Sequence, residues 1–402
     1  MPEISNRAIG LPESPIRKLA PFANAAKADG VKVYHLNIGQ PDIKTPQVFF
    51  DAIAAVDTSL LSYSPSAGIS SLREVVAEYY RRYDCDVVYD DVLVTTGASE
   101  AINFVLRAIL DAGEEMIVPE PYYANYLSFT MANDGVLVPV SSYIENDFAL
   151  PAISDFEAKI TSKTRAIMIC NPANPTGILY PKAALTELLD LVKRRDLFLI
   201  ADEVYREFVY DDHKHHSVLS FRQQYENIIV IDSISKRFSA CGARIGNVIS
   251  KNHKLLQMIL KMAQARLSPP TFGQIGAEAV YQLPLEYYEI NIAEYQKRRD
   301  LVLDWLQEIP GVACPVINGA FYAMVRLPVD DSDRFCEWML REFRYNNSTL
   351  MLAPGSGFYV TPGLGSDEVR IAYVLNCEGL TAAMECLQAG LAAYPGRSGV
   401  AE

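Results

Sequence analysis

The stretch IIVIDSISKRFSACGARIG, residues 228–246, decides the fold class, because an uninterrupted apolar run passes directly into a polar cluster that contains glycine. Such a run is typical of a strand that helices cover on both faces. Similar runs end in polar turns at residues 92–97, 165–171 and 197–203, and segments of helical period separate them. The sequence therefore predicts an α/β fold.

Four polar clusters stand at the ends of predicted strands: TTGASE at 95–100, NPANPTG at 171–177, ADEVY at 201–205 and SISK at 233–236. In open α/β sheets, ligands bind outside the carboxyl ends of the strands. We therefore expect these four clusters to form one site.

Lys236 is unusual because it follows an apolar strand, where a lone ammonium is costly to bury. A lysine taken alone is far more often a solvated surface charge. Here, however, Ser233, Ser235 and Arg244 could gather around one phosphate, which predicts a phosphorylated ligand beside an amine.

Asp202 follows five apolar residues, and a buried carboxylate needs a cation. It could equally be a helix cap, or it could pair with a pyridinium nitrogen. The two prolines of NPANPTG would fix Asn174, whose amide can donate to a phenolate oxygen, although such turns can be purely structural.

Gly97, Ala98 and Ser99 stand at a strand-to-helix junction, where free backbone N–H groups favour an anion. Tyr123 could lie flat on an aromatic ring, or it could simply pack.

The bulk composition excludes some classes of function. The chain has 402 residues and a net charge of −13, which argues against a nucleic-acid binder. We find neither a signal peptide nor an apolar run of the ~20 residues that a membrane helix needs, so a cytoplasmic location is expected. Seven cysteines without a CxxC pair predict buried thiols. The loop DDHKHHS, 211–217, lacks ordered ligand spacing, and we expect no metal.

The sequence pattern changes near residue 285, where a long charged helix is predicted to begin and short strands to follow. We predict an N-terminal arm over 1–40 that belongs to a small domain, a large ligand-binding domain over 41–284, and the rest of the small domain over 285–402.

The chain resembles the class I and II aminotransferases of pyridoxal-phosphate (PLP) fold type I. The resemblance rests on NPANPTG, DEVY, SISKRFSACGARIG and VRIAYVL (369–375), together with LNIGQPDIKTP (36–46), YSPSAGISSLRE (63–74) and TTGASEA (95–101). These motifs follow the family's order over nearly the whole chain. The resemblance implies a large domain with a mostly parallel seven-stranded sheet between helices, a smaller α+β domain, PLP as cofactor and a homodimer with shared active sites.

The resemblance also assigns roles to residues. It implies that Lys236 is the Schiff-base lysine and general base, and that Asp202 pairs with the ring nitrogen. Tyr205 and Asn174 would hydrogen-bond the phenolic oxygen. Tyr123 takes the place of the aromatic residue that stacks on the ring, where some relatives carry Trp.

Other positions correspond to the phosphate and substrate contacts of the family. Those implied for phosphate are Ser233, Arg244, Ala98 and Ser99, with Tyr63 reaching the phosphate of the neighbouring subunit. Arg370 would bind the substrate's α-carboxylate, with Gly39 and Asn174 beside it.

The expected reaction is ping-pong transfer of an amino group from an amino acid to a 2-oxo acid, with aspartate and 2-oxoglutarate as the first choice. Arg266 could contact a distal carboxylate, or it could form a surface or interface ion pair. Acidic-substrate relatives of one subgroup carry a Lys near Ser99, and this chain departs from that pattern. Aromatic or broad specificity therefore stays open. A PLP-dependent β-lyase and a PLP-sensing regulator also stay open at this point.

Overall fold

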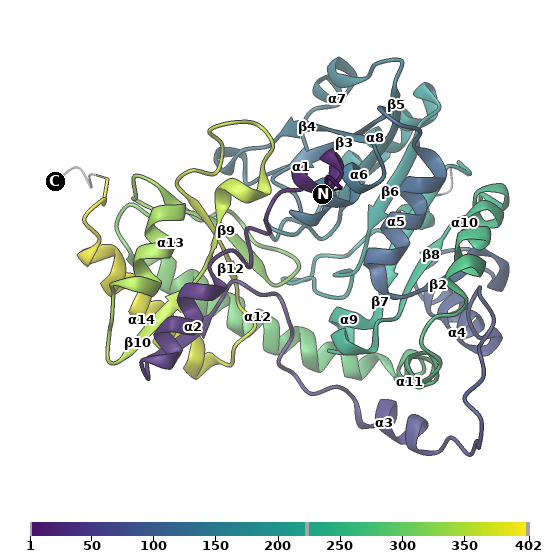
Figure 1. Cartoon of the computed structure of the whole chain (residues 1–402), viewed down its shortest axis with the longest axis horizontal. Helices are drawn as coiled ribbons and strands as arrows, with labels where there is room; N and C mark the ends of the chain where they lie inside the picture. Colours follow the sequence, from purple (N-terminus) through teal and green to yellow (C-terminus); the bar gives the residue numbers. More distant parts are fainter. Residues whose placement is uncertain (1, 222–224, 399–402) are drawn as a thin grey trace.

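The computed structural model describes residues 2–221 and 225–398. Its largest sheet has seven strands in the order β2-β8-β7-β6-β5-β3-β4 (Figure 1). The strands are β2 (Val92–Thr95), β3 (Glu115–Glu120), β4 (Val136–Ser141), β5 (Thr164–Cys170), β6 (Phe198–Asp202), β7 (Ile228–Ser233) and β8 (Gly246–Ile249). Neighbouring strands are parallel except where β8 pairs with β2 and β7. The predicted α/β fold with a mostly parallel seven-stranded sheet is confirmed.

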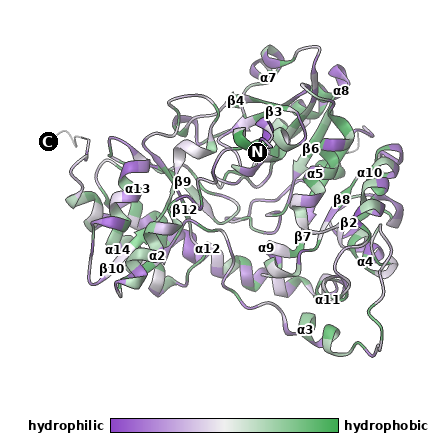
Figure 2. Cartoon of the chain, in the orientation of Figure 1, coloured by the Kyte–Doolittle hydropathy of each residue, from purple (hydrophilic) through white to green (hydrophobic). Residues whose placement is uncertain are grey.

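Helices cover both faces of this sheet, as the apolar strands predict. One face is covered by α5 (Gly97–Ile109) and α10 (His253–Arg266), and the other by α4 (Ser70–Arg81), α8 (Lys182–Arg195) and α11 (Thr271–Tyr281). Within β6, Ile200 joins the first core, whereas Leu199 and Ala201 join the second. Each fully buried leucine or isoleucine side chain contributes about 2 kcal/mol. Figure 2 shows β6 as largely hydrophobic and α5 as a mixture of hydrophobic and hydrophilic residues.

The shorter helices of this part of the chain lie around the sheet and its loops. They are α3 (Gln47–Ala54), α6 (Asn125–Ala132), α7 (Ile153–Lys159) and α9 (Ile234–Arg237). Of these, α9 follows β7 without a gap and carries Lys236.

A second set of strands brings the two ends of the chain together. β1 (Lys32–His35) pairs in parallel with β10 (Ser348–Met351). β9 (Tyr322–Arg326), β11 (Ala353–Pro354) and β12 (Glu368–Ala372) form an antiparallel sheet. The helices here are α2 (Ala20–Ala28), α13 (Ser332–Arg341) and α14 (Cys377–Ala393), whereas α1 (Asn6–Gly10) lies beside α6 at the large sheet (Figure 1).

The long helix α12 (Leu285–Glu308) passes from the side of the large sheet toward this second set of elements (Figure 1). The domain boundaries at 40 and 284 stay predictions. Of the helices described, none is both long enough and apolar enough to cross a membrane. All seven cysteines are free thiols.

Candidate active site

A cavity of about 530 Å³ lies at the carboxyl ends of β5, β6 and β7 and is closed on another side by β9 and β12. Its volume is in the range of small-molecule sites. Eleven of the predicted site residues line it: Gly39, Ala98, Ser99, Tyr123, Asn174, Asp202, Tyr205, Ser233, Lys236, Arg244 and Arg370. The four polar clusters therefore meet, as the strand-end argument predicts.

Lys236 is held in the cavity by the junction between β7 and α9. Ser233 caps α9, because its Oγ accepts from the backbone N–H of Ser235 at 3.4 Å. The Lys236 Nζ donates to the carbonyl oxygen of Gly39 at 2.8 Å. Burial lowers the pKa of Lys236, which favours its neutral, basic form.

Asp202 is the last residue of β6 and is buried. Its Oδ2 accepts from the Tyr126 hydroxyl at 2.7 Å, and its Oδ1 accepts from the backbone N–H of Val204 at 3.3 Å. Burial raises the pKa of Asp202 to about 6. Since a nearby cation favours the ionised form, a ligand with a protonated nitrogen would suit this carboxylate.

A chain of polar groups crosses the cavity from the second set of strands. The Asn174 Nδ2 donates to the Tyr205 hydroxyl at 3.4 Å, and the hydroxyls of Tyr205 and Tyr322 lie 2.9 Å apart. All three side chains are buried. Burial raises the pKa of Tyr205 well above its ordinary value, so its hydroxyl stays protonated and can donate.

Arg370, on β12, is only 1% exposed. Its Nη1 donates to Asn174 Oδ1 at 2.9 Å and its Nη2 to the carbonyl oxygen of Asn37 at 2.5 Å, whereas its Nε has no partner among the described residues. Burial lowers the pKa of Arg370. A buried guanidinium without a carboxylate partner is costly, so this position is suited to bind an anion.

A second position suited to an anion lies where α5 begins. Gly97 has φ +75°, and a Cβ there would lie 2.2 Å from the Arg244 Nη2, so the guanidinium lies directly against the helix N-terminus. A Cβ on Gly246 would lie 2.4 Å from the carbonyl carbon of Gly97. The first N–H groups of a helix have no partner within it, so Ala98 and Ser99 with Arg244 offer donors and positive charge to a phosphate.

The sequence analysis missed two tyrosines of this site. Tyr126 orients Asp202, and its ring lies edge-on to that of Tyr123 with centroids 5.4 Å apart. Tyr322 contacts Tyr205, and the Arg370 guanidinium lies 4.5 Å from its ring centroid. The signal that could have found Tyr126 is its place three residues after Tyr123, in the first turn of α6. Nothing in the strand around Tyr322 distinguishes it from a core residue.

The model of the family described as "Aminotransferase class I and II" matches residues 31–387. The chain belongs to this family. It is 32% identical to the aspartate aminotransferase of Pyrococcus horikoshii over 96% of its length and 97% of that protein. It is also 32% identical to the aromatic-amino-acid aminotransferase 2 of Thermococcus litoralis, over 96% and 97% of the two chains. The structure of Thermus thermophilus aspartate aminotransferase with maleate superimposes with a TM-score of 0.87 at 28% identity, covering 97% of this chain and 100% of that one.

The chain is therefore an aminotransferase, and its family uses PLP. The residues of the cavity fit this cofactor in three respects. They provide an amine for its aldehyde at Lys236, a buried carboxylate without an ion-pair partner among the described residues at Asp202, and an anion position at Arg244 and the N-terminus of α5. Because the family model and the relatives named above are aminotransferases, they do not support the β-lyase or the regulator interpretation.

Two predicted site residues of the aminotransferase lie outside the cavity of their own chain. Tyr63 is 77% exposed, so it is free to reach another molecule. The Arg266 Nη1 pairs with Glu100 Oε2 at 2.8 Å and also donates to Thr96 Oγ1 at 3.2 Å. Its Nη2 donates to the carbonyl oxygen of Ser66 at 3.1 Å. The structure thus favours an ion pair for Arg266 over contact with a substrate.

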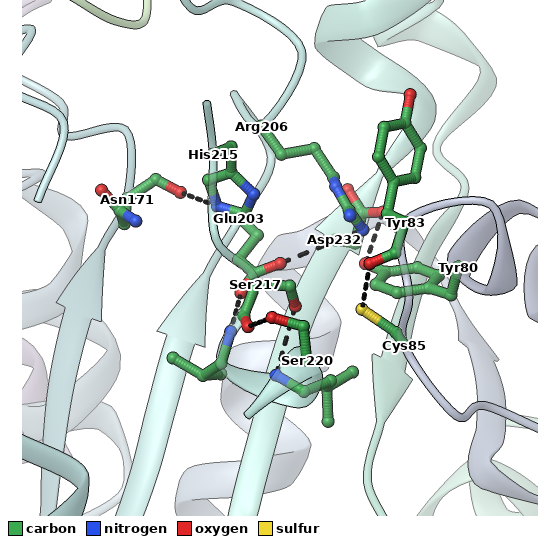
Figure 3. A network of polar contacts seen from close by, with 12 residues as sticks. Tyr80, Tyr83, Cys85, Asn171, Glu203, Arg206, His215, Ser217, Ser220 and Asp232 are labelled. Carbon is green, nitrogen blue, oxygen red and sulfur yellow. Dashed lines mark hydrogen bonds and ion pairs between the residues drawn. The ribbon is translucent and has the colours of Figure 1, made fainter. Parts of the chain in front are cut away.

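Behind the aminotransferase site lies a group of charged residues that we call the buried ion cluster: Glu203, Arg206, Glu207, Asp232 and Arg237. Arg237 pairs with Asp232, and its Nε lies 3.1 Å from Glu207 Oε2. Figure 3 shows Arg206 beside Glu203. The Arg206 guanidinium lies 4.4 and 4.7 Å from the ring centroids of Tyr80 and Tyr83. None of these residues lines the cavity.

The histidine loop, for which the sequence predicts no metal, runs past this cluster. The ring Nε2 of His215 lies 3.1 Å from the carbonyl oxygen of Asn171 (Figure 3), whereas His213 is exposed. Among the described residues, no group of His, Cys, Asp and Glu side chains is arranged to hold a metal ion.

Proposed function

We propose that this aminotransferase transfers the amino group of an acidic L-amino acid, with aspartate as first choice, to 2-oxoglutarate by a ping-pong reaction. The observation that carries the proposal is one cavity that holds a lysine amine of lowered pKa and a buried arginine without a carboxylate partner among the described residues, at Lys236 and Arg370. The amine can move a proton while the guanidinium fixes a carboxylate beside it.

PLP, when bound, supplies an electron sink for the negative charge that develops at the substrate's α-carbon. Lys236 would hold the cofactor, and Asp202 would keep a proton on its ring nitrogen. Tyr205 and Asn174 would donate to its phenolic oxygen, and Tyr123 would stack on its ring. The phosphate would contact Ser233, Arg244 and the backbone N–H groups of Ala98 and Ser99.

The donors of the cavity that the cofactor would not use are available to bind the substrate. Arg370 would bind the α-carboxylate as a bidentate pair, and Asn174, already bonded to Arg370 at 2.9 Å, would orient the guanidinium. The Gly39 carbonyl that accepts from Lys236 would lie beside the substrate. In this arrangement Lys236 removes the proton of the α-carbon and returns it elsewhere on the bound molecule.

We also propose a homodimer with shared active sites, in which Tyr63 contributes to the phosphate position of the partner subunit. Its support is the family and the exposure of Tyr63, together with nearby exposed apolar residues Leu60 and Leu61. Exposed apolar side chains gathered in one segment favour a protein interface.

The choice of an acidic substrate cannot rest on identity alone, because an aspartate and an aromatic aminotransferase are equally similar to the chain, at 32% each. Its support is the positive charge of the cavity, which is lined by three arginines and one lysine against one carboxylate, Asp202. An excess of cations favours anionic ligands. Aromatic or broad specificity is the second candidate, supported by that relative.

The test is a titration of the PLP-loaded protein with single amino acids and no oxo acid, followed by the absorbance of the bound cofactor. We expect aspartate and glutamate to convert the cofactor to its amine form at far lower concentrations than phenylalanine, tyrosine or alanine. Conversion by aromatic amino acids at the lowest concentrations would contradict the acidic assignment alone. Release of ammonia and pyruvate without this conversion would contradict the transfer reaction and indicate a β-lyase.

A further inference from the structure

One cation of the cavity has no role in the function proposed above. Of the four that line it, Lys236 and Arg244 would serve the cofactor and Arg370 would take the α-carboxylate. Arg17 is the fourth, and it comes from the segment between α1 and α2, far in sequence from the other three. Neither the motifs of the sequence nor the geometry of the cofactor groups accounts for it.

The backbone around Arg17 is held in place. The carbonyl oxygen of Ile16 accepts from the buried Asn37 Nδ2 at 2.8 Å, and the carbonyl oxygen of the same Asn37 accepts from Arg370. Pro15 and Leu19 are buried, and Lys18 pairs with Asp333. Arg17 therefore lies in a segment that is hydrogen-bonded to Asn37, the residue whose carbonyl oxygen accepts from Arg370.

The side chain of Arg17 differs from its basic neighbours in having no partner. Among the described residues, no carboxylate lies within ion-pair distance of its guanidinium, whereas Arg7 pairs with Asp134 at 3.0 Å and Lys18 with Asp333. Arg17 is exposed and lines the cavity together with Ile38, Ser99, Tyr123 and Asn125. A guanidinium at a cavity wall with all its donors free is suited to bind a carboxylate.

Tyr123 lines the same cavity as Arg17 and Arg370. Burial raises the pKa of Tyr123, the charges of Arg370, Arg17 and Arg244 act against that rise, and the charge of Asp202 adds to it. A ligand beside Tyr123 would therefore lie in a cavity lined by both Arg17 and Arg370.

We infer that Arg17 binds the distal carboxylate of a dicarboxylic substrate, while Arg370 binds its α-carboxylate. The inference rests on the proposed function for the α-carboxylate and adds the residue that selects acidic side chains. It replaces Arg266, whose guanidinium is already bonded to Glu100, Thr96 and Ser66. A dicarboxylate brings two charges into the cavity, and Arg17 is the lining cation that neither the cofactor nor the α-carboxylate engages.

The experiment compares wild type, Arg17→Gln and Arg17→Lys as PLP-loaded proteins. Calorimetric titration with succinate and with butyrate, which differ by one carboxylate, measures the distal contact without turnover. We expect Arg17→Gln to weaken succinate binding about 10- to 100-fold and to leave butyrate binding unchanged, with partial recovery in Arg17→Lys. In steady-state assays, kcat/KM for aspartate should fall by a similar factor while that for alanine stays constant.

Arg7→Gln is the matched control, since Arg7 is an exposed arginine of the same N-terminal region that does not line the cavity. Succinate binding that is equal in wild type and Arg17→Gln would overturn the inference, as would equal losses for succinate and butyrate. A protein that transfers no amino group from any donor would contradict the proposed function instead, and the succinate and butyrate titrations would still decide the role of Arg17.

Discussion

The cavity and the buried ion cluster are built from neighbouring residues of the same two strand ends, yet they differ in charge and in pairing. Asp202 and Tyr205 line the cavity, whereas the next residues, Glu203 and Arg206, belong to the cluster. Lys236 lines the cavity, and the next residue, Arg237, has a side chain with no exposed surface. Side chains that are consecutive in the sequence therefore lie in two different environments, the cavity and the buried ion cluster.

The cavity has four cations against one carboxylate, whereas the cluster has two cations against three carboxylates. Cluster cations pair with carboxylates of the same chain, but the cavity's Arg370 and Arg17 have none among the described residues. The difference teaches that charge alone does not mark a ligand site. In this molecule the cations of the ligand site lack a carboxylate partner among the described residues, whereas the cations of the cluster have one even where, as at Glu207, the oxygens accept no hydrogen bond.

The largest effect on the cavity side is expected from Lys236→Ala. Removing the amine that we propose moves the proton should lower kcat by at least about 10³-fold, because a positioned general base contributes typically about 10² to 10⁴ and this lysine is also proposed to hold the cofactor. The variant should still bind PLP without a covalent bond, as absorbance after gel filtration would show. Lys254→Ala, at an exposed lysine, is the control. Turnover at the wild-type rate in Lys236→Ala would refute the assignment.

On the cluster side, Arg237→Met should act on stability. It leaves Asp232 buried without its main cation, and breaking a buried pair costs about 3–5 kcal/mol. The measurement is the free energy of unfolding from urea denaturation. Arg334→Met is the control, because Arg334 is 75% exposed and its pair with Asp330 spans 3.7 Å, so about 0–1 kcal/mol is expected there. Equal losses of unfolding free energy in Arg237→Met and Arg334→Met would contradict the expected difference between a buried and an exposed ion pair.

Arg370→Ala tests the unpaired cation of the cavity. Loss of the proposed bidentate contact with the α-carboxylate should raise KM for the amino acid about 10²-fold, corresponding to ~3 kcal/mol, with little change in PLP affinity. Because Arg370 has no carboxylate partner among the described residues, whereas Arg237 pairs with Asp232 and Glu207, the loss of stability should be smaller than for Arg237→Met. An unchanged KM would count against its role with the α-carboxylate.

The sequence predicted the sheet and the meeting of the polar clusters because strand ends of one parallel sheet share an edge. It did not predict Tyr322 or Arg17, which reach the cavity from β9 and from the segment before α2. Such long-range placement depends on how the second set of strands packs, and no local pattern reports it. Arg266 illustrates the same limit, because only the fold shows that Glu100 lies beside it.

The sequence analysis also missed the buried ion cluster, although DEVY contains Glu203 and Arg237 directly follows SISK. Alternation along a short turn does not reveal which neighbour faces the cavity and which faces the core. In the structure, Glu203 and Arg206 are 1% and 4% exposed, and only this burial identifies them as an internal network.

The smallest expected effect concerns the pH dependence of the cluster and is tested by Glu207→Gln. Burial raises the pKa of Glu207 to about 8, against an ordinary value of 4.5, although the charge of Arg237 acts in the opposite direction. Between these two values the folded protein holds a proton that the unfolded chain has released. The folded state therefore loses stability as the pH rises through this window, and the loss is complete above about pH 8.

Glutamine cannot ionise, so Glu207→Gln should lack this part of the slope. Unfolding free energies from urea denaturation at three pH values between 5 and 8.5 should fall less steeply with pH in the variant than in wild type. Part of the slope should remain, because burial also raises the pKa of Glu203 to about 7. Glu342→Gln, at an exposed glutamate, should keep the wild-type slope. Parallel curves for wild type and Glu207→Gln would mean that Arg237 and Arg206 keep Glu207 ionised. Glu207 would then be a charged partner of the cluster cations, in contrast to the cavity cations, which lack a carboxylate partner among the described residues.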